Sequence, residues 1–300
     1  MSQIKEAESS PGRPLAEKIA LYVIGIAVAL AAGYYLSLAL IPTPKIGVMY
    51  LDTQVTDFLA ASMAQEITYV RNANDIKGIV LVVNSPGGSA SAGHDIYFQF
   101  RKLREEKPVV ASMDVLAASA AYQIAVAANE IYAKPASLVG NVGVIVGLPR
   151  PETLSEQFLT TGPFKATAFS VTGITQKLDL LYADFRDSVV AERSAAPNPL
   201  KLKPDEVATG EIWVGLEAKE YGLVDEMGSV LDAIERTAEL ANLKHYDVVN
   251  VRDEYLASLG DKELTSALDL YEKLDNQPKI DLSSQQTEWP SFYQLYVPLE

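Results

Sequence analysis

The chain reads GIVLVVNSPGG from residue 78 to residue 88, an apolar run that ends in a proline and two glycines. An uninterrupted apolar run of this length is typical of a strand buried on both faces of a parallel sheet. Glycine has no Cβ, so the backbone after Pro86 can turn sharply and leave its N–H groups unhindered. The segment therefore predicts a buried strand followed by a turn that can hydrogen-bond to a negatively charged oxygen, with Gly88 as a candidate donor.

Alternating strands and helices extend from this segment in both directions. The apolar pattern predicts strands at 45–51, 78–83, 108–113 and 130–133, and helices at 55–71, 96–106, from 119 onward, at 178–193 and at 263–274. Such alternation is typical of an α/β fold with parallel strands and right-handed crossovers. Sites in these folds form beyond the carboxyl ends of strands, where we expect both Gly88 and Ser119 to lie.

Ser119 is a candidate nucleophile. It lies in a run of small residues, 117–121, that we interpret as the start of an apolar helix. The N–H groups at the start of a helix are free and favour negative charge, which suits a reacting hydroxyl. Close packing of a helix start would explain the same small residues without any catalytic role.

A serine nucleophile requires an adjacent base, and the chain offers lysines and histidines. Lys165 has apolar neighbours, and no acidic residue lies between Glu156 and Asp179. Because burial disfavours the ammonium form, a lysine in apolar surroundings can serve as a neutral base. The alternative bases are Lys134, Lys177, His94 and His245. His94 has no obvious orienting acid apart from Asp95 and Asp114.

Several short motifs follow one another along the chain. They are PGG at 86–88, ASAAY at 118–122, LVGNVGVI at 138–145, GPFK at 162–165, GLEA at 215–218 and GLVDEMG at 222–228. In this order they resemble the signal peptide peptidase A (SppA) family of membrane-anchored Ser-Lys proteases. The resemblance covers residues 45–250 and implies a Clp protease/crotonase-like spiral of parallel strands and helices.

The resemblance also implies roles for individual residues. Ser119 matches the family nucleophile and Lys165 the general base. Gly88 matches an oxyanion donor, and the N–H group of Ala120 is a plausible second donor. The implied activity is that of a serine endopeptidase that degrades signal peptides or other membrane-associated peptides, and it requires no cofactor and no metal.

The chain departs from the family pattern at two places. Ala120 and Ala121 stand where the family usually has two glycines, so each adds a methyl group to the expected pocket. Asn141 stands where the family tends to have a serine that is thought to orient the lysine. An asparagine carboxamide can accept a hydrogen bond from an amine, which makes Asn141 the lysine-orienting candidate.

The N-terminus predicts a membrane anchor. Residues 19–41 are 23 consecutive uncharged and mostly apolar positions, enough for a helix to cross a hydrocarbon core of about 30 Å. A cleaved signal peptide is the alternative, but its apolar region normally runs about 7–15 residues. Lys5, Arg13 and Lys18 precede the segment, so the positive-inside rule places the N-terminus in the cytoplasm and the protease domain outside it.

Composition narrows the classes of partner. The net charge is −14, and residues 42–300 carry all of it, which argues against nucleic acid as a partner. The absence of cysteine excludes a disulfide framework and a thiolate zinc site. We therefore expect a peptide or protein substrate, a lipid bilayer around residues 19–41, and a homo-oligomer of the kind found in Clp-like folds.

Four regions are expected along the chain. They are a cytoplasmic segment 1–18, a transmembrane helix 19–41, an SppA-like protease domain 42–251 and a C-terminal extension 252–300. The extension ends in an aromatic stretch, WPSFYQLYV at 289–297. Exposed apolar patches are rare, so we expect this stretch to dock on its own domain. Packing at a subunit interface or in the substrate groove is the alternative.

Two other functions fit parts of the same pattern. A catalytically degenerate membrane scaffold of the same fold would explain the alanines at 120 and 121 and Asn141. A crotonase-type acyl-CoA enzyme would share the oxyanion architecture. That enzyme class normally relies on carboxylates, and no glutamate lies near Ser119 in the sequence.

Overall fold

The computed structural model describes residues 15–40, 42–147, 161–162, 165, 168–275 and 292–295. Contacts between Cα atoms divide the chain into two units, Met1–Thr43 and Pro44–Glu300. The residues expected to be cytoplasmic, 1–18, lie largely outside the described part, as do Phe164 and Ala166 beside Lys165.

The described residues of the first unit form one apolar helix and a short stretch after it. Helix α1 spans Leu15–Leu40, and its segment Glu17–Ser37 is long and apolar enough to cross a membrane. The expected helix at 19–41 is therefore present, although it begins four residues earlier. Its side chains are exposed wherever the structure describes them, as suits a helix whose apolar surface faces lipid.

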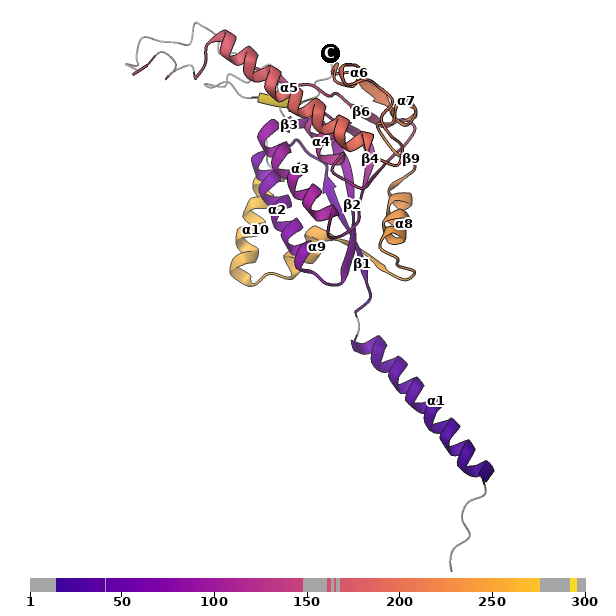
Figure 1. Cartoon of the computed structure of the whole chain (residues 1–300). Helices are drawn as coiled ribbons and strands as arrows, with labels where there is room; N and C mark the ends of the chain where they lie inside the picture. The colour runs from indigo at the N-terminus through magenta and orange to yellow at the C-terminus, as the bar shows by residue number, and fades with distance from the viewer. Residues whose placement is uncertain are drawn as a thin grey trace, which may run out of the picture. The chain divides into compact units, whose positions relative to one another are not determined.

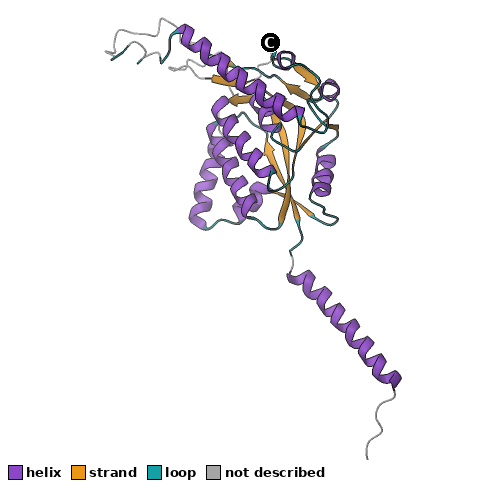
Figure 2. Ribbon diagram, viewed as in Figure 1, coloured by secondary structure: helices purple, strands orange, loops and turns teal. Residues whose placement is uncertain are grey.

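The second unit is built on an eight-stranded, mostly parallel sheet among the described residues (Figures 1 and 2). Its main path runs β10-β1-β2-β4-β5-β9, and β6 pairs with β4 and with β8. The strands are β1 (Lys45–Leu51), β2 (Ile76–Ser85), β4 (Val109–Ala118), β5 (Glu130–Ala133), β6 (Leu138–Gly140), β8 (Ile212–Val214), β9 (Glu226–Met227) and β10 (Asp247–Asn250). Only the β6–β8 pair is antiparallel in this sheet.

Helices cover both faces of the sheet, which explains why its central strands are apolar throughout (Figure 1). One face carries α2 (Asp57–Asn72), α3 (Ala90–Arg104), α4 (Ala120–Ala125), α9 (Val251–Ala257) and α10 (Asp261–Asp275). The other face packs Ile46, Val80 and Val110 against α8 (Val230–Leu240). The remaining helices are α5 (Val171–Ser194), α6 (Pro204–Val207) and α7 (Gly215–Tyr221).

The C-terminal helices belong to the same core as the protease-like region. Tyr271 and Leu274 of α10 are buried against the cluster that contains α2. The Tyr271 hydroxyl donates to the buried Glu66 carboxylate at 2.8 Å, and Arg252 of α9 contacts the same oxygen at 3.4 Å. Burial raises the pKa of Glu66, and these two partners oppose that rise. Residues 252–275 are therefore packed into the unit.

Several elements are longer than the apolar pattern predicts. Strand β4 continues to Ala118, because Leu116–Ala118 pair with β6 beyond the predicted end at 113. Helix α3 begins at Ala90 because the Ser89 side chain caps it by accepting from the Ala92 N–H group. Helix α5 begins at Val171 in the same way, with Ser170 as its cap.

A buried ion pair fixes the C-terminal end of α5. Both oxygens of the Asp225 carboxylate accept from the Arg193 guanidinium at 2.8 Å, and each side chain is 3% exposed. Asp225 also accepts from the Ile131 N–H group, and Arg193 donates to the Gly222 carbonyl. The pair thus joins α5 to the sheet and to the segment that precedes β9.

Replacing Asp225 by alanine is expected to lower the free energy of unfolding by about 3–5 kcal/mol, because it leaves the Arg193 charge buried without a partner. Thermal unfolding should show this as a fall in Tm. The control is Asp187→Ala, which removes an exposed carboxylate paired with Arg186 and should leave Tm unchanged. Equal Tm values for the two variants would show that the buried pair does not stabilise the fold.

Candidate active site

Ser119 lies at the junction of β4 and α4, as the sequence predicts. It is the N-cap residue of α4, with φ 57° and ψ −125°, and its N–H group donates to the Gly140 carbonyl at 2.8 Å. A positive φ is unusual for a residue with a side chain, and such backbone strain is concentrated at functional sites. The side chain is fully buried, and Oγ has no hydrogen-bond partner in the described part of the chain.

The glycine turn lies beside this serine. Strand β3 (Gly87–Ser89) follows β2 directly and contacts α4, because β2 and β4 are neighbours and Ser85 pairs with Ala117. At Gly88, φ is 157°, and a Cβ atom would lie 2.1 Å from the Val55 carbonyl oxygen. Only glycine therefore fits there. The prediction that Gly88 and Ser119 lie beyond the carboxyl ends of two strands is confirmed, and these strands, β2 and β4, are neighbours in the sheet.

Backbone geometry supplies the donors that an oxyanion needs. Ala120 is the first residue of α4, so its N–H group has no acceptor within the helix. The Val55 N–H group donates to the Gly87 carbonyl, and the Val55 carbonyl accepts from the Ser89 N–H group, both at 2.8 Å. Successive peptide groups of a strand point to opposite edges, so the Gly88 N–H group points away from Val55.

Tyr122 holds α4 in place. Its side chain is fully buried, and its hydroxyl donates to the Leu223 carbonyl at 2.8 Å. Burial raises the pKa of Tyr122, so the phenol stays a neutral donor. The helix that carries Ser119 is thereby tied to the segment between α7 and β9.

Asn141 directly follows Gly140, whose carbonyl accepts from the Ser119 N–H group, but the Asn141 carboxamide is already hydrogen-bonded elsewhere. Its Nδ2 group donates to the Gly210 carbonyl at 2.7 Å, and its backbone N–H group donates to Glu211 at the same distance. It has φ 55°, which asparagine tolerates better than most residues. The role of Asn141 as the lysine-orienting residue stays a prediction.

Lys165 is not hydrogen-bonded to Ser119 in this structure. Its side chain is exposed, whereas the Ser119 hydroxyl is buried and unpartnered. Its backbone N–H group makes a long contact of 3.5 Å with the Gly162 carbonyl. The Ser-Lys dyad therefore stays a prediction that requires Lys165 to approach the nucleophile.

Three of the alternative bases are engaged elsewhere. Both ring nitrogens of His94 face acceptors, the Ala90 carbonyl at 2.8 Å and the Asp184 carboxylate at 2.5 Å, so neither is free to take a proton from serine. Lys134 forms an ion pair with Asp114. The ammonium group of Lys177 lies 4.9 Å from the centre of the Phe169 ring.

Sequence reasoning missed two polar residues that contact His94. Asp184 of α5 lies 90 positions from His94 along the chain, so no local pattern reveals the pair. Gln123 lies one helical turn after Ser119; it is fully buried, and its Nε2 atom lies 3.3 Å from His94 Nε2. Its Oε1 atom, like Ser119 Oγ, is buried without a described partner.

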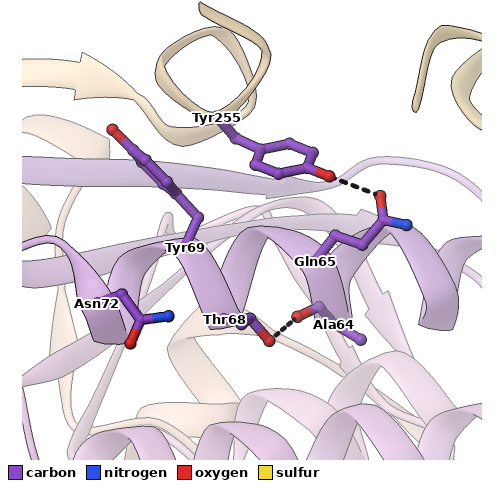
Figure 3. A pocket seen from close by; sticks show the side chains of 6 residues that line it. All are labelled: Ala64, Gln65, Thr68, Tyr69, Asn72 and Tyr255. Carbon is purple, nitrogen blue, oxygen red and sulfur yellow. Dashed lines mark hydrogen bonds between the residues drawn. The ribbon is translucent and has the colours of Figure 1, made fainter. Parts of the chain in front are cut away.

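A surface pocket lies elsewhere, between α2 and α9 (Figure 3). Its lining residues are Ala64, Gln65, Thr68, Tyr69, Asn72 and Tyr255. The Tyr255 hydroxyl donates to Gln65 Oε1 at 3.1 Å (Figure 3). Tyr255 belongs to α9, and the other lining residues come from the C-terminal half of α2, whereas the glycine turn pairs with Val55 just before α2 begins. The pocket contains none of the predicted site residues.

Comparison with known proteins agrees with this geometry. The Clp protease family model matches residues 44–139, which include the glycine turn and Ser119, and the peptidase family S49 model matches residues 101–244. A solved ClpP1 structure from Listeria monocytogenes aligns with 66% of this chain and 99% of that chain at 16% identity, with a TM-score of 0.46. The two family models overlap on residues 101–139, which include Ser119, and thus assign the fold to the Clp-protease-like class.

Protease-named relatives identify the family. A protein of Methanocaldococcus jannaschii named as a protease is 30% identical over 222 residues, which cover 67% of this chain and 70% of the relative. "Protease 4" of Salmonella typhi is 34% identical over 64% of this chain, and "Serine protease SPPA, chloroplastic" of Arabidopsis thaliana is 30% identical, also over 64%. The match spans only 32% and 30% of these two relatives. The chain belongs to peptidase family S49.

Proposed function

We propose that the protein is a membrane-anchored serine endopeptidase that uses Ser119 as its nucleophile and Lys165 as its general base. The observation that carries the proposal is the junction of β3, β4 and α4. There a strained serine without a described hydrogen-bond partner lies next to a glycine turn in which the Gly88 N–H group points away from Val55. Family membership and the protease-named relatives support the same reaction class.

The proposed reaction begins with transfer of the Ser119 proton to the neutral amine of Lys165. The alkoxide attacks the carbonyl carbon of a peptide bond, and the N–H groups of Gly88 and Ala120 hold the resulting oxyanion. The Lys165 ammonium then protonates the leaving amine. In the second half of the cycle Lys165 takes a proton from water, and the hydroxide releases the acyl group from Ser119.

This mechanism requires Lys165 Nζ to come within hydrogen-bond reach of Ser119 Oγ. Because the Lys165 side chain is exposed, the proposal requires a rearrangement that brings this side chain to the serine. We propose that Asn141 orients the lysine once it is there.

The location of the reaction follows from α1. Helix α1 would act as a single-pass anchor, with residues 1–18 in the cytoplasm and the second unit on the opposite side of the membrane. Signal peptides and other membrane-associated peptides are the proposed substrates. The exposed apolar side chains of α5, Val171 and Leu180, favour assembly into a homo-oligomer.

The fully buried Ser119 also favours one competing function, a catalytically degenerate scaffold. A fluorophosphonate probe separates the two, because it forms a covalent bond only with an activated serine. We expect the full-length protein to be labelled and Ser119→Ala to remain unlabelled. Absence of labelling in the folded wild-type protein, under conditions that label a control serine protease, would favour the scaffold.

A further inference from the structure

A small cavity of about 240 Å³ lies where β1 and β10 end. These strands are parallel neighbours, so their carboxyl ends meet at one edge of the sheet, where α/β folds build ligand sites. None of the residues proposed for catalysis lines this cavity. Its lining residues all carry polar groups: Tyr50, Asp52, Glu66, Asn250 and Arg252. The cavity is therefore a candidate for a second site.

Glu66 lines the cavity with a carboxylate that is only half engaged. Its side chain is 3% exposed, and Oε1 accepts from the Tyr271 hydroxyl at 2.8 Å and contacts Arg252 Nε at 3.4 Å. Oε2 has no hydrogen bond within the described part of the chain. A nearly buried carboxylate oxygen without a donor is costly, so Oε2 is the oxygen left to meet a ligand in the cavity.

Asp52 brings a second carboxylate to the same cavity. Burial raises the pKa of Glu66, and the negative charge of Asp52 adds to that rise, whereas Tyr271 and Arg252 oppose it. The two carboxylates therefore repel each other. Arg252 offsets one of the two charges, and its guanidinium also lies 4.4 Å from the centre of the Tyr271 ring. One negative charge is left for a ligand to neutralise.

The C-terminal part of the chain completes the cavity. Asn250 and Arg252 lie beyond residue 244, where the match to the peptidase family S49 model ends. Asn250 Oδ1 accepts from the Arg252 N–H group at 3.0 Å, so it caps α9 and holds the backbone of Arg252 beside the cavity. Strand β10 stops at Asn250, which pairs with Val48, whereas β1 continues to Leu51. The outer edge of β1 beyond Val48 is thereby open in the described residues, and Tyr50 forms a wall there.

We propose that this cavity binds a primary ammonium group, either the side chain of a peptide lysine or a free polyamine. An ammonium group has three N–H donors and one positive charge, so it can donate to Glu66 Oε2 and to the Asp52 carboxylate at once. A divalent metal ion fits less well, because the Arg252 guanidinium shares the cavity. Moreover, no group of three or more acidic or histidine side chains that could hold a metal occurs in the described part of the chain. Binding here does not depend on the proposed peptidase activity.

Calorimetric titration of the full-length protein in detergent tests the site. The probes are Nα-acetyl-lysine amide and cadaverine, and the control ligand is the same lysine amide with its side-chain amine acetylated. We expect saturable binding of at least one amine and none of the control, because acetylation removes the charge. Tighter binding of the lysine amide would assign a peptide side chain as the occupant, and tighter binding of cadaverine a polyamine. No saturable binding of either amine, or equal binding of the acetylated control, would overturn the proposal.

Two substitutions locate the bound amine. Asp52→Asn should weaken binding about tenfold, because it removes one charge-assisted hydrogen bond. The control is Asp57→Asn, which makes the same change of charge at an exposed position outside the cavity and should keep the affinity within about twofold. Glu66→Gln keeps the size of the side chain and should weaken binding as Asp52→Asn does. Asp52 is exposed, so its variant tests the site even where Glu66→Gln fails to fold.

Two results would overturn the assignment of the ligand. One is equal affinity of Asp52→Asn and Asp57→Asn for the amine, which would place the bound amine outside the cavity. The other is binding of calcium or magnesium ions that Asp52→Asn abolishes while neither amine binds. The Ser119→Ala variant should bind the amine as the wild-type protein does, so the outcome is independent of whether the protein hydrolyses peptides.

Discussion

Ser119→Ala is expected to abolish peptide hydrolysis, with a fall in kcat/KM of roughly 10⁴- to 10⁶-fold. The magnitude follows from the loss of the covalent acyl intermediate. The serine and its base act as a unit, so the base alone does not sustain the reaction once the hydroxyl is removed. Alanine is smaller than serine and keeps the backbone N–H group, so the oxyanion donors stay in place. The measurement is hydrolysis of a fluorogenic peptide by the full-length protein in detergent or vesicles.

A matched control distinguishes chemistry from folding. Ser112 lies on the same strand, β4, and is 1% exposed, but the proposed reaction does not use it. Ser112→Ala should retain activity within about threefold, because removing a hydroxyl away from the site changes only packing. Equal activity of Ser119→Ala and Ser112→Ala, with both proteins folded by circular dichroism, would exclude Ser119 as the nucleophile.

The parts of the fold that depend on local sequence could be predicted. The run at 78–83 is apolar because β2 is covered on both faces, and strands β1 and β5 occupy the predicted residues 45–51 and 130–133. The glycine turn and Ser119 could also be placed, because each directly follows a strand and the two strands are neighbours. Local pattern thus placed the residues that we propose as oxyanion donors and nucleophile, and their roles stay a prediction.

Features that join distant residues could not be predicted in the same way. The carboxylate that engages His94 is Asp184, and the carboxylate that neutralises Arg193 is Asp225; neither spacing corresponds to a helix or strand period. For the aromatic stretch at 289–297, of which the structure describes only residues 292–295, we expected docking on its own domain, with a subunit interface or the substrate groove as the alternative. Periodicity alone does not specify which strand the stretch pairs with, and the pairing of β11 (Phe292–Leu295) with Gly87–Ser89 follows only from the three-dimensional arrangement of those edges.

Replacing Lys165 by alanine is expected to lower kcat about 10²- to 10⁴-fold, the usual contribution of a general base, while labelling by peptide aldehydes falls in parallel. Lys165→Arg should be equally impaired, because arginine remains charged and cannot take a proton at working pH. The same fluorogenic-peptide assay measures kcat for both variants.

The control for this prediction is Lys177→Ala. Lys177 is another exposed lysine near the start of α5, and it contacts the Phe169 ring instead of the nucleophile. Its replacement should leave kcat unchanged. A normal kcat in Lys165→Ala together with a reduced kcat in Lys177→Ala would reverse the assignment of the base. The comparison works because the two lysines differ in position but share the same charge, so a change in net charge alone cannot produce the expected contrast.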